Sequence, residues 1–206
     1  MRLAAEELRE DYPEANIIVI DTLCACMGEG LLAHYAYEMK KAGKSLSETF
    51  SWLEENKSRV HQMGPIDDLT FVARRGQISS GKAFMGNLVG IKPMGDSNAE
   101  GYVTVLAKVK GIKKALDVTV SYLESMATDI EDQYIFIMHS DREKYAFTLK
   151  EKLEEKVKAK KIFVSDVFSA CGTNIGPGMV GVYFLGNPVS ADLSKEKEAL
   201  NRAIEG

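Results

Sequence analysis

The residues best suited to bind a ligand lie in a glycine-rich segment, Gly172–Gly178, which reads Gly-Thr-Asn-Ile-Gly-Pro-Gly. Glycine tolerates positive φ angles, and Pro177 followed by Gly178 suits a type II turn. N–H groups exposed by such a turn can form a nest that binds an anion. No Gly-Lys-Ser/Thr sequence follows, so the segment is not a P-loop. Two interpretations stay open: an anion site, or an ordinary connection between two strands.

The histidines offer acid–base or metal chemistry only as isolated residues. His34, His61 and His139 are far apart in the sequence, and none has a local metal-ligand or acid–base partner. We interpret each as a surface histidine or as one whose hydrogen bonds are satisfied. No nucleophile–base pair is evident, so the sequence predicts no catalytic residue.

The carboxylates and thiols give no stronger indication of a metal or redox site. Asp67 and Asp68 could bind a metal, but adjacent carboxylates at the start of a strand more often cap a turn. Cys24 and Cys26 lack the two-residue spacer of redox and zinc pairs, and Cys171 stands alone. We predict no metal site and interpret the cysteines as small packing residues.

The charge balance narrows the class of protein. The 206 residues include 26 Lys and Arg and 30 Asp and Glu, which gives a net charge of −4. This balance argues against a nucleic-acid or anionic-membrane surface. Three cysteines, no signal peptide and no long apolar run indicate a soluble protein of a reducing compartment, without stable membrane insertion.

The elements that would position these residues form an α/β pattern. In the first third of the chain, the sequence predicts a helix over residues 2–13, a buried strand over residues 16–21 and two further helices. The second of these helices begins with a capping box at Ser45 and Glu48. A lone buried strand needs parallel neighbours. We therefore expect residues 1–63 to be the remnant of an α/β domain that lacks its first part.

The remainder, residues 64–206, is predicted to form a β-rich second domain. The run IKPM, the turn residues GDSNAEG and the run YVTVLAKV indicate a hairpin. After Gly111, helices alternate with the strands YIFIMHS, KIFVSDVFS and MVGVYFLG, and a second capping box is predicted at Ser140 and Glu143. An extra polar helix, capped by Ser194, closes the chain.

Four segments resemble DegV-type proteins in their order and spacing: DDLTFVARRGQIS, GNLVGIKPM, KVKGIKKAL and GTNIGPG. In addition, VIDTLCACMGEGLL is similar to that family's IDS-x-x-x-S-x-G-x-G segment. The resemblance covers nearly all of the chain up to about Gly186. It implies a DegV-like α/β fold, with an incomplete Rossmann-like first domain followed by a two-layer α/β domain that contains a six-stranded mixed sheet.

The resemblance also implies a function. DegV-type proteins are bacterial, cytoplasmic proteins that bind a long-chain fatty acid and are not enzymes. Those studied for function present the fatty acid to a separate fatty acid kinase, which makes acyl phosphate for phospholipid synthesis. The acyl chain lies in a slot of the second domain, and the carboxylate sits at the domain junction. No cofactor besides this ligand is implied, and the oligomeric state stays open.

The family's motifs suggest which residues form the site. The head group would be held by Thr173, Asn174 and the amide of Gly176, with Asn174 at the position of a family histidine. Kinase docking would involve Arg74, together with Lys110 at a position where the family often has arginine. The acyl-chain slot would be lined by Met27, Gly28, Leu31, Ile78, Phe84, Met85, Leu88 and Ile91.

The sequence also departs from the family. It lacks the opening strand and the Thr-Ser-Gln-Pro-Ser and Ser-Gly-x-Ser-Gly-Thr segments, whose hydroxyls hold the carboxylate, so we expect weaker retention of the ligand. Three alternatives remain. The slot residues could simply form the core. The chain could resemble a dihydroxyacetone kinase subunit, with His61 or His139 tethering the substrate. It could also be an interaction domain that binds nothing.

Overall fold

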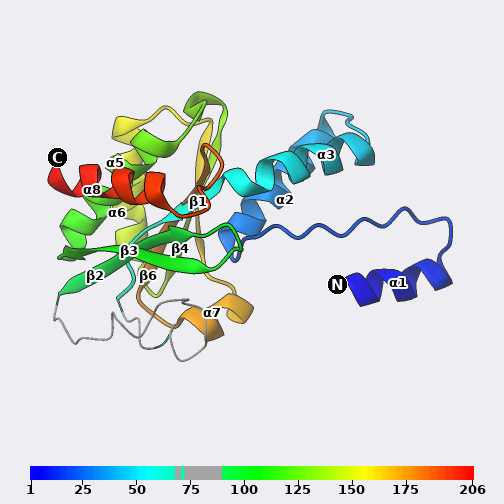
Figure 1. The fold of residues 1–206 in the computed structure, drawn as a ribbon, viewed down its shortest axis with the longest axis horizontal. Helices are drawn as coiled ribbons and strands as arrows, with labels where there is room; N and C mark the ends of the chain where they lie inside the picture. The colour runs from blue at the N-terminus through cyan, green and yellow to red at the C-terminus, as the bar shows by residue number, and fades with distance from the viewer. Residues whose placement is uncertain (68–70, 72–89) are drawn as a thin grey trace.

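The computed structural model describes residues 1–67, 71 and 90–206 of the chain. It contains helices on both faces of a central sheet, with a separate hairpin beside it (Figure 1). Of the predicted site residues, Arg74, Ile78, Phe84, Met85 and Leu88 lie outside the described residues.

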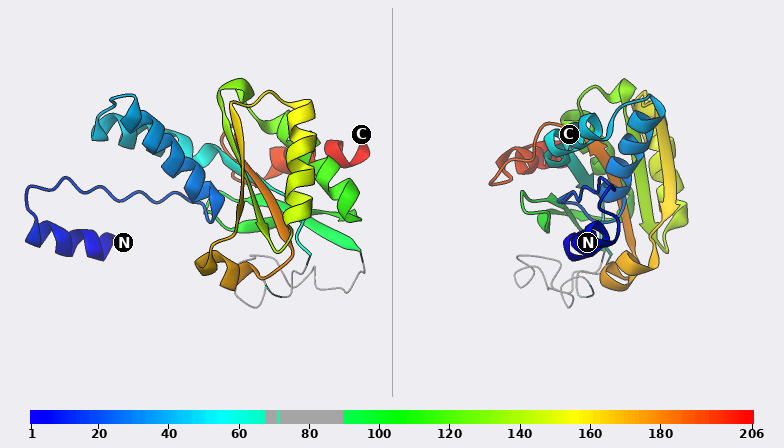
Figure 2. Two further views of the ribbon diagram at one scale, coloured as in Figure 1. Left: turned by 180° about the vertical axis from the view of Figure 1, so that it is seen from behind. Right: turned by 90° about the vertical axis from the view of Figure 1, so that its right-hand side faces the viewer.

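The N-terminal region is helical, without a strand. Helix α1 stands apart from the rest of the molecule at the end of a long extended segment (Figures 1 and 2). The strand predicted over residues 16–21 is wrong: this segment is extended but pairs with no strand in the described part of the chain. A strand needs a neighbour to accept and donate its ladder hydrogen bonds. The N-terminal elements are α1 (Arg2–Asp11), α2 (Met27–Lys41), α3 (Leu46–Asn56) and the short 3-10 helix η1 (Lys57–Arg59).

The central sheet has four strands in the order β1-β6-β4-β5. Strands β4 and β5 run parallel, whereas β6 is antiparallel to both β1 and β4. Strand β1 lies before the predicted domain division at residue 64 and pairs with β6 far beyond it, so the sheet draws on both sides of that division, which stays a prediction. The strands are β1 (Val60–Met63), β4 (Tyr134–Ser140), β5 (Lys161–Asp166) and β6 (Met179–Leu185).

The predicted hairpin is confirmed. Strands β2 (Ile91–Ser97) and β3 (Val103–Lys110) pair antiparallel, with an irregular register next to Gly95. A Cβ atom at Gly95 would lie 2.1 Å from the carbonyl oxygen of Thr104, so only glycine allows this close approach. The six-stranded mixed sheet is therefore wrong in its strand count: among the described residues there is a mixed sheet of four strands and a hairpin of two, although the α/β fold class holds.

The sheet separates two hydrophobic clusters. Side chains alternate between the faces of a strand, so Ile137 of β4 enters one cluster and Met138 the other. The first cluster packs α5 (Ile112–Met126), α6 (Glu143–Lys156) and α8 (Ser194–Glu205) around Ile137. The second packs α2 and α3 around Met138. Helices thus cover both faces, as the two sides of the sheet in Figure 2 show.

The helix ends confirm one of three predicted caps. Ser45 and Glu48 form a capping box, with each side chain accepting from the other residue's backbone N–H. Helix α6 begins at Glu143, after Arg142, so the capping box predicted at Ser140 and Glu143 is wrong: Ser140 is the last residue of β4, and its Oγ donates to the carbonyl of Gly176, 2.5 Å away. Helix α8 follows Leu193, whose φ is 57°, so the cap predicted at Ser194 is also wrong.

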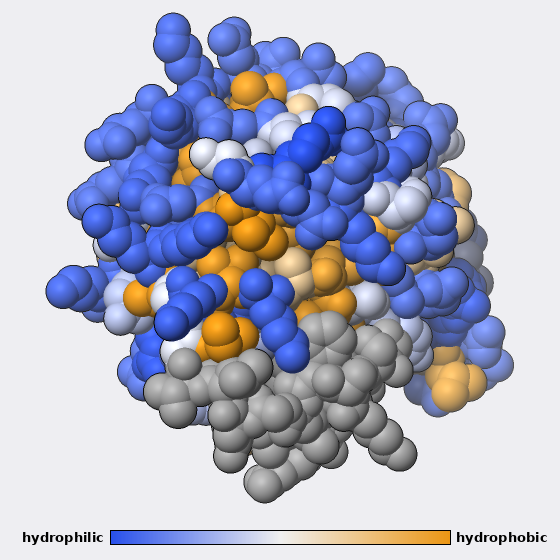
Figure 3. All heavy atoms as spheres, turned by 60° about the vertical axis from the view of Figure 1, so that its left-hand side comes forward, coloured by the Kyte–Doolittle hydropathy of each residue, from blue (hydrophilic) through white to orange (hydrophobic). Residues whose placement is uncertain are grey.

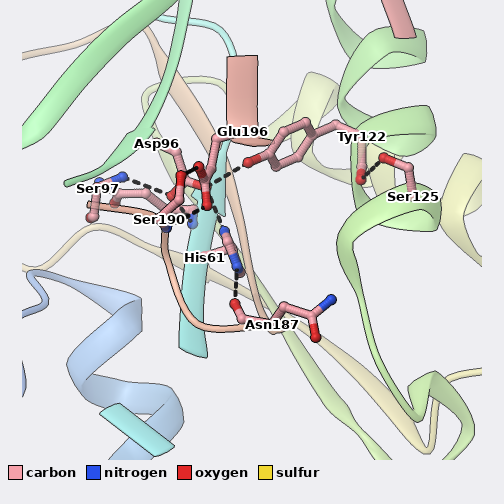
Figure 4. Close-up of polar contacts among 9 residues, drawn as sticks. His61, Asp96, Ser97, Tyr122, Ser125, Asn187, Ser190 and Glu196 are labelled. Atoms are coloured by element: carbon pink, nitrogen blue, oxygen red, sulfur yellow. Dashed lines mark hydrogen bonds and ion pairs between the residues drawn. The ribbon is translucent and has the colours of Figure 1, made fainter. Parts of the chain in front are cut away.

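A buried polar network ties the hairpin to the sheet and to the segment before α8 (Figure 4). His61, Asp96 and Tyr122 are all fully buried. The Asp96 carboxylate accepts from the Tyr122 hydroxyl at 2.7 Å and from the backbone N–H of Gln62 at 2.8 Å. His61 Nε2 lies 2.8 Å from the carbonyl of Asn187.

Candidate ligand site

The glycine-rich segment forms a helix followed by a turn. Helix α7 (Ser169–Ile175) contains the first residues of the segment, so the connection between β5 and β6 is partly helical. The head-group donors predicted here already have acceptors. Thr173 Oγ1 and Asn174 Nδ2 donate to the carbonyl of Ala170 at 3.0 and 2.9 Å, and the Gly176 amide donates to Gly172. A carboxylate would therefore bind by displacing these local hydrogen bonds.

The turn after α7 packs against the segment that follows β1, which contains Asp67 and Phe71. Gly176 has φ 68°, and a Cβ atom there would lie 2.6 Å from the ring of Phe71. Gly178 has φ 100° and lies against the Asp67 side chain in the same way. Backbone hydrogen bonds join Asp67 N–H to the Gly178 carbonyl and Gly178 N–H to the Ser140 carbonyl. The structure thus brings the predicted head-group end next to residues 67 and 71.

Asp67 is the electrostatic centre of this junction. Its carboxylate pairs with Lys92 through Oδ1 and with Arg142 through Oδ2, the latter at 2.9 Å. The three side chains are partly buried, with 18–31% exposed, so solvent screens these pairs less than pairs on the open surface. The metal role considered for Asp67 finds no support among the described residues, where no group of three or more potential ligands gathers.

The described slot residues lie in two places. Met27, Gly28 and Leu31 are on α2, where Leu31 is fully buried against the sheet and Met27 packs on the same cluster. Ile91 begins β2, which belongs to the hairpin. The other predicted slot residues fall outside the described part of the chain, so the slot stays a prediction.

Cys24 and Cys26 lie just before α2, and Cys26 contacts Cys171 of α7. Burial, with smaller contributions from nearby carboxylates, raises the pKa of Cys24 to about 12. Burial, together with a hydrogen bond to Cys171, also raises the pKa of Cys26. Their thiols therefore stay protonated near neutral pH and are poor nucleophiles. None of the three cysteines forms a disulfide. All belong to or border the second hydrophobic cluster, the one that packs α2 and α3 (the α2 cluster), as expected of packing residues.

His61 matches the interpretation of a histidine with satisfied hydrogen bonds. His139 lies in register with Asp166 on the parallel strands β4 and β5, a pairing that the sequence does not predict. His139 Nδ1 is 3.3 Å from Asp166 Oδ1 but has no hydrogen-bond partner in the described structure. The signal available in the sequence is that each residue stands at or next to the carboxyl end of its strand.

Comparison with known proteins assigns this α/β chain, with its Gly-Pro-Gly turn at the sheet edge, to a known protein family. The profile of a family described as "Uncharacterised protein, DegV family" matches residues 2–187. The chain belongs to the DegV family, which confirms the resemblance seen in the sequence. It is 43% identical over 185 residues to the DegV domain-containing protein CPE0026 of Clostridium perfringens strain 13, covering 90% of this chain but 64% of that relative.

Solved structures share the fold. A DegV family protein from Thermus thermophilus, described as binding fatty acid, is 25% identical with a TM-score of 0.79, covering 90% of this chain and 64% of that protein. Another similar structure is the Fatty Acid Kinase (Fak) B3 protein of Streptococcus pneumoniae, loaded with linoleic acid. It is 20% identical with a TM-score of 0.79, and the match covers 90% of this chain and 66% of that protein.

One face of the molecule combines hydrophilic and apolar side chains (Figure 3). Figure 3 shows apolar side chains gathered in the middle of one otherwise hydrophilic face, the side that carries the C-terminal helix in Figure 1. Within the described ranges, no helix is long and apolar enough to cross a bilayer.

Proposed function

We propose that this chain binds a long-chain fatty acid and is not itself an enzyme. The observation that carries the proposal is the likeness to the fatty-acid-binding DegV protein of Thermus thermophilus, which extends over 90% of this chain at 25% identity. The chain spans about 64% of that protein's length, so the proposal concerns the ligand of the shared portion.

The binding free energy would come from the acyl chain. Burying hydrocarbon contributes about 0.8 kcal/mol per methylene, so a long chain supplies ample energy for an apolar slot. We propose the slot residues Ile78, Phe84, Met85, Leu88 and Ile91, with Met27, Gly28 and Leu31 of α2 closing it. Leu31 contributes mainly as packing, because it is already fully buried in the α2 cluster.

The carboxylate would lie against Thr173, Asn174 and Gly176. A carboxylate removed from water without donors costs several kcal/mol. Thr173 is exposed and Asn174 half-exposed, so both can turn from the Ala170 carbonyl toward a ligand. Asparagine donates a neutral hydrogen bond, which is weaker than one from a charged imidazole.

We further propose that the bound fatty acid is presented to a partner fatty acid kinase, with Arg74 and Lys110 at the docking surface. Lys110 is exposed at the end of β3, as docking requires. The competing phosphotransferase function is disfavoured for His61, which is fully buried with both ring nitrogens at hydrogen-bond distance from acceptors, and so cannot tether a substrate.

A pair of phenylalanine substitutions tests the slot. Phe84→Asp places a charge in the proposed slot, whereas Phe147→Asp places one on α6, where Phe147 is 46% exposed. Fatty acid extracted from each purified protein is quantified by mass spectrometry. We expect Phe84→Asp to lose the co-purified fatty acid and Phe147→Asp to retain it. Equal retention by both folded variants would contradict the slot.

A further inference from the structure

A cavity lined mainly by polar and charged residues opens at the carboxyl edge of the sheet. It has a volume of about 800 Å³ and lies where the parallel strands β4 and β5 end, the place where open α/β sheets bind ligands. Most of the residues that line it are charged, although Ile112 and Tyr145 also border it, whereas the residues of the proposed acyl-chain slot are uncharged. The titratable side chains that line it include Lys92, His139, Arg142, Lys144, Asp67 and Asp166.

Two helices begin at this cavity. Gly111 precedes α5 and Arg142 precedes α6, and both residues line the cavity. Neither helix has a side-chain cap in the described structure. The N–H groups of a first turn carry partial positive charge, and two helix dipoles directed at one space favour an anion.

A buried histidine gives independent evidence for a ligand. His139 is 5% exposed, lines the cavity, and has an Nδ1 atom without a hydrogen-bond partner in the part of the chain that the structure describes. Buried polar atoms are nearly always hydrogen-bonded, and an exception calls for an explanation such as an unfilled ligand site. The neighbouring Asp166 side chain is 84% exposed and can turn away.

The charges facing the cavity are arranged around an internal carboxylate. Lys92 and Arg142 both pair with Asp67, so Asp67 occupies the position between them that an external anion would take. The other acidic side chains are solvent-exposed: Asp141 and Asp166 are each 84% exposed, and Glu143 is also exposed. Water therefore screens their repulsion, while Lys144 adds a third cation at the rim.

We propose that this cavity binds the phosphate group of a small phosphorylated molecule. Arg142 and Lys92 supply charged donors, the starts of α5 and α6 supply amides, and His139 supplies an imidazole donor. A tetrahedral oxyanion can use donors from all these directions, whereas a carboxylate has two oxygens in one plane. Asp67 acts as the built-in competitor that the phosphate displaces. The site goes beyond fatty-acid binding and does not depend on it.

Isothermal titration calorimetry with inorganic phosphate tests the site with one variant that should bind phosphate more tightly and with others that should bind it more weakly. Asp67→Asn removes the competitor, and we expect it to bind phosphate at least tenfold more tightly than the parent chain. Arg142→Gln on the Asp67→Asn background should lose that gain, since one charged hydrogen bond corresponds to a tenfold change or more. His139→Gln on the same background should weaken binding in the same direction. Lys41→Gln, at the far end of α2, should change nothing.

Two results would overturn the proposal. One is the absence of saturable phosphate binding to a folded Asp67→Asn protein, as judged by circular dichroism. The other is displacement of phosphate by oleate together with loss of oleate binding in Arg142→Gln, which would assign the cavity to the fatty-acid carboxylate. Failure of phosphate binding would leave the proposed fatty-acid slot intact, because the slot is tested by Phe84→Asp and not by any cavity variant.

Discussion

His61 Nδ1 lies 2.7 Å from Asp96 Oδ2, and both side chains are fully buried (Figure 4). Because His61 Nε2 also faces an acceptor, the carbonyl of Asn187, both ring nitrogens are placed to donate. The ring is therefore held as an imidazolium in a buried ion pair. The ion pair joins β1 to β2, and the contact between His61 and Asn187 joins β1 to the segment that leads to α8.

The pair predicts how stability depends on pH. Burial acts to lower the pKa of His61, but the Asp96 carboxylate and the Asn187 carbonyl outweigh it, and the pKa of His61 is raised above 6.5. A raised folded-state pKa stabilises the protein fully below pH 6.5, and this stabilisation is lost as the pH rises through the folded-state value. We expect the free energy of unfolding, measured by urea denaturation, to fall above pH 6.5. His61→Gln should abolish that slope; an unchanged slope would contradict the ion pair.

Tyr122 supports the same carboxylate from α5. Tyr122→Phe removes the hydroxyl that donates to Asp96 Oδ2 at 2.7 Å. A lost hydrogen bond to a charged group costs about 1.5–3 kcal/mol, and we expect a decrease of that size in the free energy of unfolding. Tyr102→Phe is the matched control, because Tyr102 is 53% exposed and its loss should change stability by less than about 0.5 kcal/mol. Equal effects from the two variants would show that the network contributes little.

The contact between Gly176 and Phe71 predicts a stability difference between two glycines. Gly176 and Gly43 have similar positive φ angles, 68° and 79°, but only Gly176 has atoms where a Cβ would lie. Alanine in the left-handed region costs roughly 1–2 kcal/mol, and Gly176, with ψ −175°, lies in a region that is essentially restricted to glycine. We expect Gly176→Ala to destabilise the protein by at least about 1 kcal/mol more than Gly43→Ala, since the Phe71 ring must also move. Matching melting temperatures for the two variants would argue against the contact.

The proposed kinase docking predicts a separation of binding from turnover. Arg74→Ala should retain fatty acid but lose acyl-phosphate formation when the protein is supplied with a fatty acid kinase and ATP. Lys41→Ala, an exposed cation at the end of α2, serves as the control and should support normal turnover. Normal acyl-phosphate formation with Arg74→Ala would remove this residue from the docking surface.

Local patterns predicted most of the fold. The alternation and turn residues of the β2–β3 hairpin, the period of α5 and the apolar runs of β4, β5 and β6 are each encoded within one segment. The capping box at Ser45 and Glu48 is correct for the same reason, since both partners are three residues apart.

The features that local patterns did not predict depend on residues that are far apart in the sequence. Ser140 does not cap α6 because it ends β4, two residues before the N-cap position at Arg142, and its hydroxyl instead donates to Gly176, 36 residues away. The run over residues 16–21 has the composition of a strand, but no described strand lies beside it to form a ladder. The pairing of His61 with Asp96 joins residues 35 apart, and the meeting of His139 with Asp166 depends on strand order. Neither pairing can be recognised from one short window of sequence, because each depends on how separate strands are arranged.

Native mass spectrometry of the purified chain tests the central proposal most directly. The mass of the folded protein is measured before and after delipidation, and again after addition of oleate. The proposed function predicts one fatty acid bound per chain, removed by delipidation, restored by oleate, and weakened by Asn174→Leu. A folded chain that carries no fatty acid and does not bind added oleate would contradict the proposed function.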